Sequence, residues 1–262
     1  MTDWRKRIAI ISDEAADSFA EAVGFCLPLG IRAYELRKLE GGRFPHVTES
    51  AIEEVAETVS RHELELIGVS PGFFKGPLDA EVIARTFDHD LPLAFRLMER
   101  LGLRQMTLFT FRRGNRDEAI PDEIYEHLGR AVELCAREGI EVLLENASSI
   151  YSDTGANLAT IARALGLGIV WDPCNAAQSG ELAFPDGYRQ VREALAAVHF
   201  KNWSQEQGVV AINAGIVDMA AQVRALQADG YAGYYTLEPH QWHDRKNAVR
   251  NNHEQLLALL EG

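Results

Sequence analysis

Four side chains of metal-binding types stand at the ends of four successive apolar segments. They are Glu145 in VLLEN, Asp172 in GIVWDP, His199 in AVHFKN and Glu238 in TLEPH. Parallel strands that carry chemistry present such residues at their carboxyl ends. A single acid at a strand end is more often a helix cap or an ion-pair partner, but the set of four favours a metal site. Three carboxylates and one imidazole suit Mn²⁺, our first choice, or Mg²⁺, and the histidine also admits Co²⁺ or Zn²⁺.

The chemistry expected of such a site is proton transfer beside a carbonyl. Four protein ligands around an ion that prefers roughly six leave positions for substrate oxygens. The ion then polarises the carbonyl and stabilises the enediolate that forms when a neighbouring proton leaves. Lys201 lies two residues after His199 and is expected to point the same way. It either contacts a substrate oxygen or the enediolate, or it is a solvated lysine at the rim.

Further candidates lie close to these segments. Glu35 and Arg37 in YELRK share the inward side of a second strand and predict a buried ion pair, either structural or in contact with substrate. Trp203 and His240 follow the seventh and eighth strands. Trp203 is a candidate for stacking on a sugar, and His240 for a pocket wall or a hydrogen-bond donor. The alternatives are a buried loop anchor for Trp203 and polar surface for His240.

Two loops add weaker signals. Residues 73–75 in SPGFFKG lie between glycines, which favours either a mobile lid or an ordinary packed loop. Arg112, Arg113 and Arg116 in FRRGNR are candidates for binding a phosphate or carboxylate, with a solvated loop as the alternative. Given the surplus of acid in the chain, we expect a neutral sugar to be the better substrate.

The elements that must position these residues alternate between strand and helix. Strands are expected near residues 7–11, 31–36, 64–69, 104–110, 140–145, 167–172, 196–201 and 233–238, with amphipathic helices between them. Strict alternation makes parallel sheet, and eight units close a (β/α)8 TIM barrel, here one domain over residues 1–262. Small residues on the ligand face and bulky ones on the other face suit a narrow lumen. An open doubly wound sheet is the alternative, but no GxGxxG or Walker-type loop supports it.

Composition limits the class of protein. The chain has 262 residues, 47% hydrophobic, and a formal charge of −13, which disfavours nucleic acid as a partner. Its three scattered cysteines indicate reduced thiols and hence a cytoplasmic protein. We find no apolar run of roughly 20 residues, so no membrane span is expected. A homodimer is a common assembly for soluble barrels, although the sequence leaves the oligomeric state open.

The order Glu, Asp, His, Glu, with the motifs WDPCN, VHFKN and TLEPH, resembles the xylose isomerase-like barrel superfamily. It is most similar to the sugar phosphate isomerase/epimerase members, including ketose 3-epimerases and inosose dehydratases. The resemblance covers essentially the whole chain. It implies that Glu145, Asp172, His199 and Glu238 bind one divalent metal ion. It also implies that Glu145 and Glu238 act as an acid/base pair.

The chain departs from the ketose 3-epimerases at their substrate grip. That family has a histidine three residues after the Asp ligand, an arginine six after the His ligand and a glutamate six after the first Glu ligand. Here these positions hold Asn175, Gln205 and Tyr151. Asn175 can still hydrogen-bond a sugar hydroxyl, which suggests a different substrate or reaction on the same metal. The related DNA-repair endonuclease IV branch needs three metals and histidines on early strands, whereas the early histidines here fall in expected loops or helices.

Together these observations predict a metal-dependent isomerase or epimerase of a small sugar or sugar-like polyol. A dehydratase or lyase acting on a keto-sugar or inosose is the alternative reaction, because the same enediolate can expel a β-hydroxyl. A non-catalytic carbohydrate-binding barrel is the alternative of another class.

Overall fold

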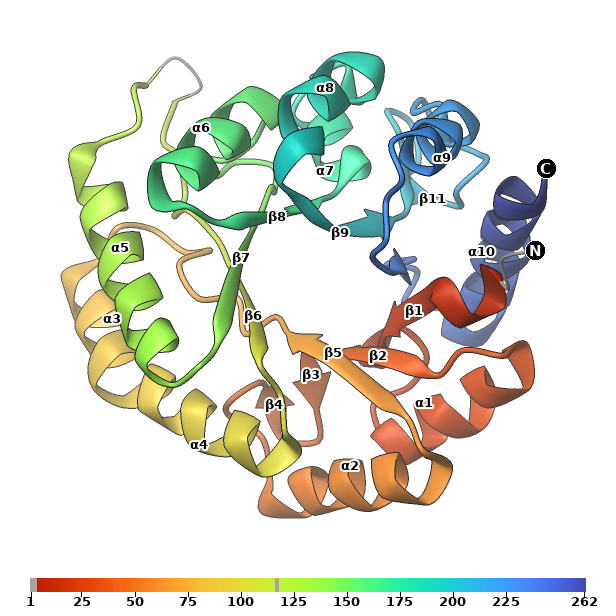
Figure 1. Ribbon diagram of the computed structural model, residues 1–262, viewed down its shortest axis with the longest axis horizontal. Coiled ribbons are helices and arrows are strands. Elements are labelled where there is room, and N and C mark those ends of the chain that lie inside the picture. The colour runs from red at the N-terminus through yellow and green to blue at the C-terminus, as the bar shows by residue number, and fades with distance from the viewer. Residues whose placement is uncertain (1–3, 116–117) are drawn as a thin grey trace.

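The protein folds into a closed barrel of parallel strands (Figure 1). The computed structural model describes residues 4–115 and 118–262. Within them eight strands close in the order β1-β12-β9-β8-β7-β6-β5-β2. Their bounds are β1 Ile8–Ile11, β2 Ala33–Leu36, β5 Glu65–Val69, β6 Gln105–Leu108, β7 Glu141–Glu145, β8 Gly168–Trp171, β9 Leu195–Phe200 and β12 Tyr235–Leu237. The predicted (β/α)8 barrel is confirmed, and the open-sheet alternative is wrong.

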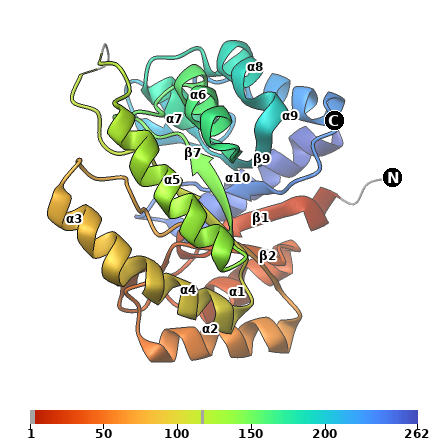
Figure 2. The same ribbon diagram turned by 60° about the vertical axis from the view of Figure 1, so that its left-hand side comes forward.

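Helices form an outer layer around the strands (Figures 1 and 2). The α-helices are α1 Phe19–Cys26, α2 Glu49–His62, α3 Ala80–Arg85, α4 Leu91–Leu101, α5 Asp122–Arg137, α6 Gly155–Leu165, α7 Pro173–Gln178, α8 Tyr188–Val191, α9 Met219–Ala228 and α10 Arg245–Glu261. Short 3-10 helices are η1 Trp4–Arg7, η2 Ser12–Glu14, η3 Leu27–Leu29 and η6 Arg192–Ala194, and π-helical turns are η4 Thr86–Asp90 and η5 Ala183–Gly187. The longer helices are amphipathic, so each buries one face against the strands.

The two faces of the strands differ in side-chain size, as the sequence predicts. Trp171 and Phe200 are fully buried, and the Trp171 indole N–H donates to Gln222 of α9 at 3.3 Å. On the inner face a Cβ at Gly168 would lie 2.7 Å from the Leu143 side chain. The lumen is therefore too narrow for larger residues at this level, and the space left at the carboxyl ends of the strands is available for the site.

Two hairpins and one loop surround that end of the barrel. The hairpins are β3 Lys38–Leu39 with β4 Gly42–Arg43, and β10 Asn202–Ser204 with β11 Gly208–Val210. The loop after β5 is hydrogen-bonded to the chain after β6, through Phe109 N to Phe73 O at 3.1 Å and Arg112 N to Gly76 O at 2.7 Å. Phe74 is buried and packs 4.9 Å from Phe111, centroid to centroid. Phe73 and Phe74 are thus packed in this structure, while Lys75 is exposed.

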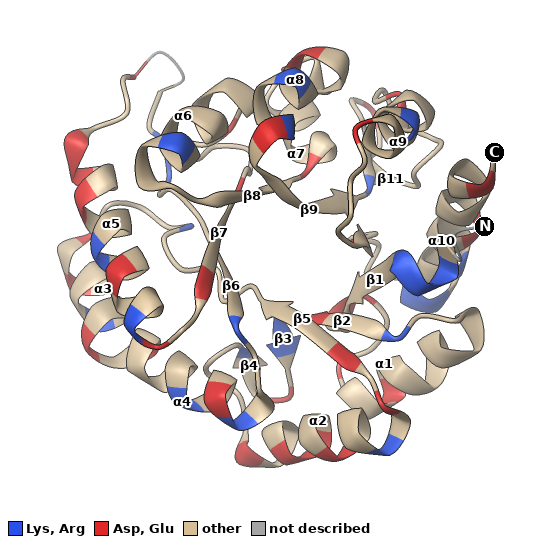
Figure 3. Ribbon diagram, in the orientation of Figure 1, with Lys and Arg blue, Asp and Glu red and all other residues tan. Residues whose placement is uncertain are grey.

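Charged residues lie mainly on the outer helices and loops, while most residues of the barrel strands are uncharged (Figure 3). None of the helices in the described ranges is long and apolar enough to cross a membrane. Charged residues of the barrel strands include Glu65 at the start of β5 and Glu145 at the end of β7.

Candidate metal centre

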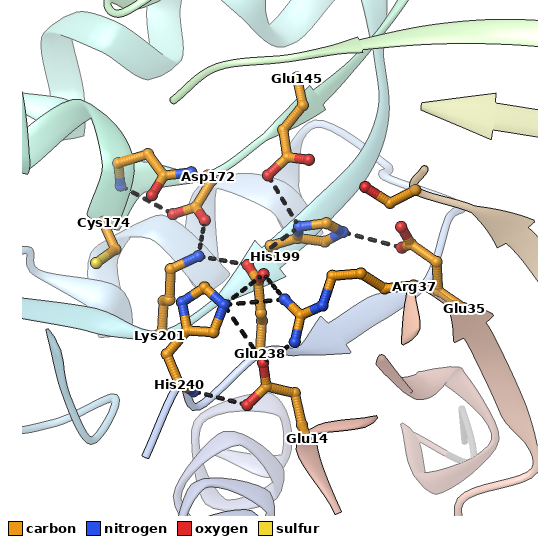
Figure 4. A network of polar contacts seen from close by, with 12 residues as sticks. Glu14, Glu35, Arg37, Glu145, Asp172, Cys174, His199, Lys201, Glu238 and His240 are labelled. Carbon is orange, nitrogen blue, oxygen red and sulfur yellow. Dashed lines mark hydrogen bonds and ion pairs between the residues drawn. The ribbon is translucent and has the colours of Figure 1, made fainter. Parts of the chain in front are cut away.

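The four expected ligands converge at the carboxyl end of the barrel (Figure 4). Glu145 ends β7, Asp172 follows β8, His199 lies in β9 and Glu238 follows β12. Each points inward, and their ligand atoms all lie within 4.8 Å of one another. All four are buried, with exposed fractions of 5% or less. Neighbouring parallel strands therefore bring together residues that are far apart in the sequence.

The contacts of His199 fit a metal ligand. Its Nε2 lies 3.1 Å from Glu35 Oε2, while Nδ1 lies 3.4 Å from both Glu145 Oε1 and Glu238 Oε2. Nδ1 is buried and makes no hydrogen bond within the described part of the chain. A histidine that donates one ring N–H to a carboxylate presents the other nitrogen to a metal. The residues present thus fit a divalent ion, with Glu35 holding the ring in position.

Lys201 lies inside the acidic cluster, where it is 1% exposed, and not on a solvated rim. Its ammonium contacts Asp172 Oδ2 and Glu238 Oε2. Burial lowers the pKa of Lys201, but Asp172 and Glu238 outweigh burial and raise the pKa well above its usual value. Asp172 also caps α7, because its Oδ1 accepts a bond from Asn175 N at 3.0 Å. Asp172 therefore caps α7 with Oδ1 and contacts Lys201 in the cluster with Oδ2.

Arg37 is the centre of a second group of contacts beside the cluster. It donates to Asp13 Oδ2 at 2.9 Å, Glu14 Oε1 at 2.6 Å and Glu238 Oε1 at 2.7 Å. The expected ion pair between Glu35 and Arg37 is wrong, because Glu35 binds His199 and Arg37 binds these three acids. Burial lowers the pKa of Arg37, but Glu238, Glu14 and Asp13 outweigh it and raise the pKa.

Asp13 and Glu14 are site residues that the sequence reasoning missed. They belong to η2, directly after β1, in the segment ISDE. Their position after the first strand is the signal that could have identified them, because all parallel strands end at the same mouth. Glu14 Oε2 also accepts the backbone N–H of His240 at 2.8 Å. Glu14 thereby fixes the segment that follows Glu238.

The two glutamates of the cluster have different surroundings. Glu238 contacts Arg37 and His240 through Oε1 and Lys201 through Oε2. Burial raises the pKa of Glu238, but Lys201 and His240 outweigh it and hold the pKa well below the usual value. Glu145 has a single ionic contact, with His199; burial raises its pKa and His199 more than offsets the rise. Glu145 therefore has fewer charged partners than Glu238.

A cavity of about 110 Å³ opens beside this centre. Its lining includes Glu145, His199, Glu238, Arg37, His240 and Trp242. Three expected substrate contacts, Glu35, Asn175 and Trp203, are not in this lining. The Asn175 side chain donates to Asn146 O at 2.9 Å, and Trp203 lies in the β10–β11 hairpin.

Arg112 and Arg113, which are expected in the loop after β6, are also not in the cavity lining. Arg112 is exposed, and Arg113 pairs with Asp153 at 3.2 Å. Arg116 lies outside the described residues.

A family model described as xylose isomerase-like TIM barrel matches residues 23–259. The chain belongs to this family. The expected resemblance is thereby confirmed over most of the sequence. No curated protein sequence matches the chain significantly.

Solved structures share the fold at low identity. One is the probable 3-DHS dehydratase AsbF from Bacillus anthracis, which is involved in petrobactin synthesis. It has a TM-score of 0.76 and 19% sequence identity, and the match covers 96% of this chain and 98% of the AsbF chain. An L-ribulose 3-epimerase has a TM-score of 0.76 and 19% identity, with coverage of 98% and 95%. The IolI protein with a bound zinc atom has a TM-score of 0.79 and 13% identity, with coverage of 97% and 98%.

Proposed function

We propose that the protein is a divalent-metal-dependent isomerase or epimerase that moves a proton beside the carbonyl of a sugar or sugar-like polyol. The observation that carries the proposal is the buried cluster at the carboxyl end of the barrel, where Nδ1 of His199, which makes no hydrogen bond to a described residue, faces Glu145 and Glu238. Glu145, Asp172, His199 and Glu238 would hold the ion, with Mn²⁺ as the first choice. When bound, such an ion supplies Lewis-acid stabilisation of negative charge on a substrate oxygen.

The side chains of the protein divide the remaining work. Glu145 has one ionic contact and lines the cavity, so it is the group that accepts the substrate proton. Glu238 is held by Arg37 and Lys201 and lines the cavity, where it takes up a proton from solvent and gives it to the other side of the substrate, while Glu145 releases its proton to solvent. Lys201 supplies a buried positive charge that favours an oxyanion over the neutral carbonyl. His240 and Trp242 form the wall against which the carbon skeleton rests.

Solvent deuterium tests this proposal whichever product forms. A panel of ketoses and cyclic keto-polyols is incubated in D₂O with Mn²⁺-loaded protein and, as a control, with chelator-treated protein. We expect deuterium on the carbon next to the carbonyl only with the metal-loaded protein, measured by mass spectrometry and NMR.

Other outcomes would assign other functions. A product lighter by one water would assign the dehydratase reaction. An isomerised product without solvent deuterium would contradict the acid/base roles of Glu145 and Glu238. If metal-loaded protein leaves the whole panel unchanged, the binding-protein alternative stands and the enzyme proposal fails.

A further inference from the structure

Arg43 and Lys75 are two of the side-chain cations in the cavity beside the metal centre that have no carboxylate partner among the described residues; a third, Lys38, lies 5.4 Å from the centroid of the Trp242 ring. Both Arg43 and Lys75 line the cavity. Arg43 donates to Ser70 O at 2.9 Å, and its Nε is buried without a hydrogen bond to any described residue. The Lys75 ammonium lies 4.2 Å from the centroid of the Phe109 ring. By contrast, Arg37 in the same cavity is tied to three acids.

The backbone fixes both cations in place. A Cβ at Gly72, where φ is +78°, would lie 2.7 Å from Arg43 Nε, so glycine there allows the loop to approach the guanidinium closely. Phe74 has a φ of 61°, which is unfavourable for a residue with a side chain. The hydrogen bonds between this loop and the chain after β6 hold Lys75 over Phe109. Such strain at the edge of a cavity is typical of a binding site.

The surroundings leave these two charges poorly compensated. Burial, and then the neighbouring Arg37, lower the pKa of Arg43. Desolvation also lowers the pKa of the Lys75 ammonium, although the residue as a whole is exposed. Glu145 and Glu238 offset part of the cost in both cases. A divalent ion held by those glutamates would compensate their charge, and Arg43 and Lys75 would then have still less counter-charge.

We propose that the substrate carries a carboxylate or phosphate group and that Arg43 and Lys75 bind this group in the cavity beside the metal centre. The inference rests on the proposed function, because it names the substrate class of the same site. An anion here would form charge-assisted hydrogen bonds with donors that lack other ionic partners. It replaces the expectation of a neutral sugar, and it moves the anion site from the FRRGNR loop to β4 and the loop after β5.

Three ketoses that differ only at carbon 6 test the proposal. They are fructose, fructuronate and fructose 6-phosphate, which are neutral, a carboxylate and a phosphate. Their binding to Mn²⁺-loaded protein is measured by titration calorimetry. We expect at least one anionic ketose to bind about tenfold or more tightly than fructose, and to lose that advantage at high salt. The better of the two anions identifies the group.

Single variants then assign the residues. Arg43→Gln and Lys75→Gln should each remove most of the preference for the anion while leaving fructose affinity within about twofold. Arg112→Gln is the matched control, because Arg112 is an exposed arginine outside the cavity lining, and it should keep the preference. Bound Mn²⁺ and circular dichroism confirm that each variant is folded. Lys75 is exposed, so its substitution retains the fold even if that of Arg43 does not.

The proposal is overturned if the wild-type protein binds the three ketoses equally, binds neither anion, or keeps its preference in both Arg43→Gln and Lys75→Gln. Failure of the proposed reaction is a separate result. An anionic ketose that binds through Arg43 and Lys75 but shows no deuterium exchange would remove the isomerase proposal and leave the anion site in place.

Discussion

The two mouths of the barrel use the same residue types in different ways. At the carboxyl end Glu145, Asp172 and Glu238 are almost fully buried and contact His199 or Lys201. At the amino end Glu65 and Glu141 are exposed. There Glu65 accepts the hydroxyl of Tyr234, and Glu141 accepts Gln105 Nε2 at 3.3 Å. The acids of one mouth are paired with charges, and those of the other with neutral donors.

Cavity size alone would identify the wrong mouth. The cavity at the amino end measures about 400 Å³ and the one at the carboxyl end about 110 Å³. What distinguishes the smaller cavity is the concentration of ionised groups at low exposure, where charges act strongly on one another. The comparison teaches that burial and partners, more than volume or the mere presence of acids, indicate where chemistry occurs.

The largest expected effect is on the rate of solvent-deuterium exchange, and it is tested with variants at the two ends of β7. Glu145→Gln should lower the rate of solvent-deuterium exchange by about 10² to 10⁴, because it removes a proton acceptor. Glu141→Gln, at the other end of β7, should keep the wild-type rate within about twofold. Both rates are measured on metal-loaded protein, with bound metal quantified in parallel. Equal rates in the two variants would contradict the functional difference between the mouths.

The next effect is on stability. Arg37→Met leaves buried acids without their cation and should reduce the free energy of unfolding by about 3–5 kcal/mol. Arg104→Met changes an exposed arginine at the amino end and should shift it by about 0.5 kcal/mol or less. Urea denaturation of metal-free protein measures both. A small loss for Arg37→Met would show that Asp13, Glu14 and Glu238 tolerate one another without it.

Metal affinity gives a third comparison, between acids on neighbouring strands. Glu35→Gln on β2 should weaken binding of Mn²⁺ by about 10- to 100-fold, because the His199 ring loses its ionised partner. Glu65→Gln on β5 should have no effect. Competition with a chelator measures the affinity, and His199→Ala serves as the reference for loss of a ligand. Unchanged affinity in Glu35→Gln would remove the positioning role of Glu35.

The smallest effect lies at the amino end. Tyr234→Phe removes the hydroxyl that Glu65 accepts and should cost about 1 kcal/mol or less, because Glu65 remains accessible to water. Burial first, and then Glu65, raise the pKa of Tyr234 to about 12, so at neutral pH the phenol is protonated and donates. Urea denaturation at neutral pH provides the measurement. If Tyr234→Phe reduced the free energy of unfolding as much as Arg37→Met does, contacts at the two mouths would contribute equally to stability.

The barrel and its central cluster were predictable because both depend on local periodicity. Strand and helix patterns alternate eight times, and inward parity places Glu145, Asp172, His199 and Glu238 on one face of the sheet at one end. The position of Lys201 follows from the same parity. These inferences need only the direction in which each side chain leaves its strand.

The partners of these residues were not predictable in the same way. Arg37 was assigned to Glu35 by parity, but its length allows it to reach Asp13, Glu14 and Glu238 instead. The side-chain amide of Asn175 donates a hydrogen bond to Asn146 O, and no spacing in the sequence indicates this contact. Arg43 lines the cavity because it lies in the short β3–β4 hairpin, and this hairpin is not part of the alternation of strands and helices. Long side chains and loop geometry thus determine details that periodicity leaves open.

Closure of β1 against β12 has a consequence for synthesis of the chain on the ribosome. Arg37 and Glu238 are 201 residues apart. At translation rates of about 5–20 residues per second, roughly 10–40 s pass between the appearance of the guanidinium and that of its last carboxylate. During that interval the nascent chain already contains Asp13, Glu14 and Arg37 but not the strand that completes their surroundings. The acidic cluster is therefore completed late in translation, only after β12 has been synthesised and has paired with β1.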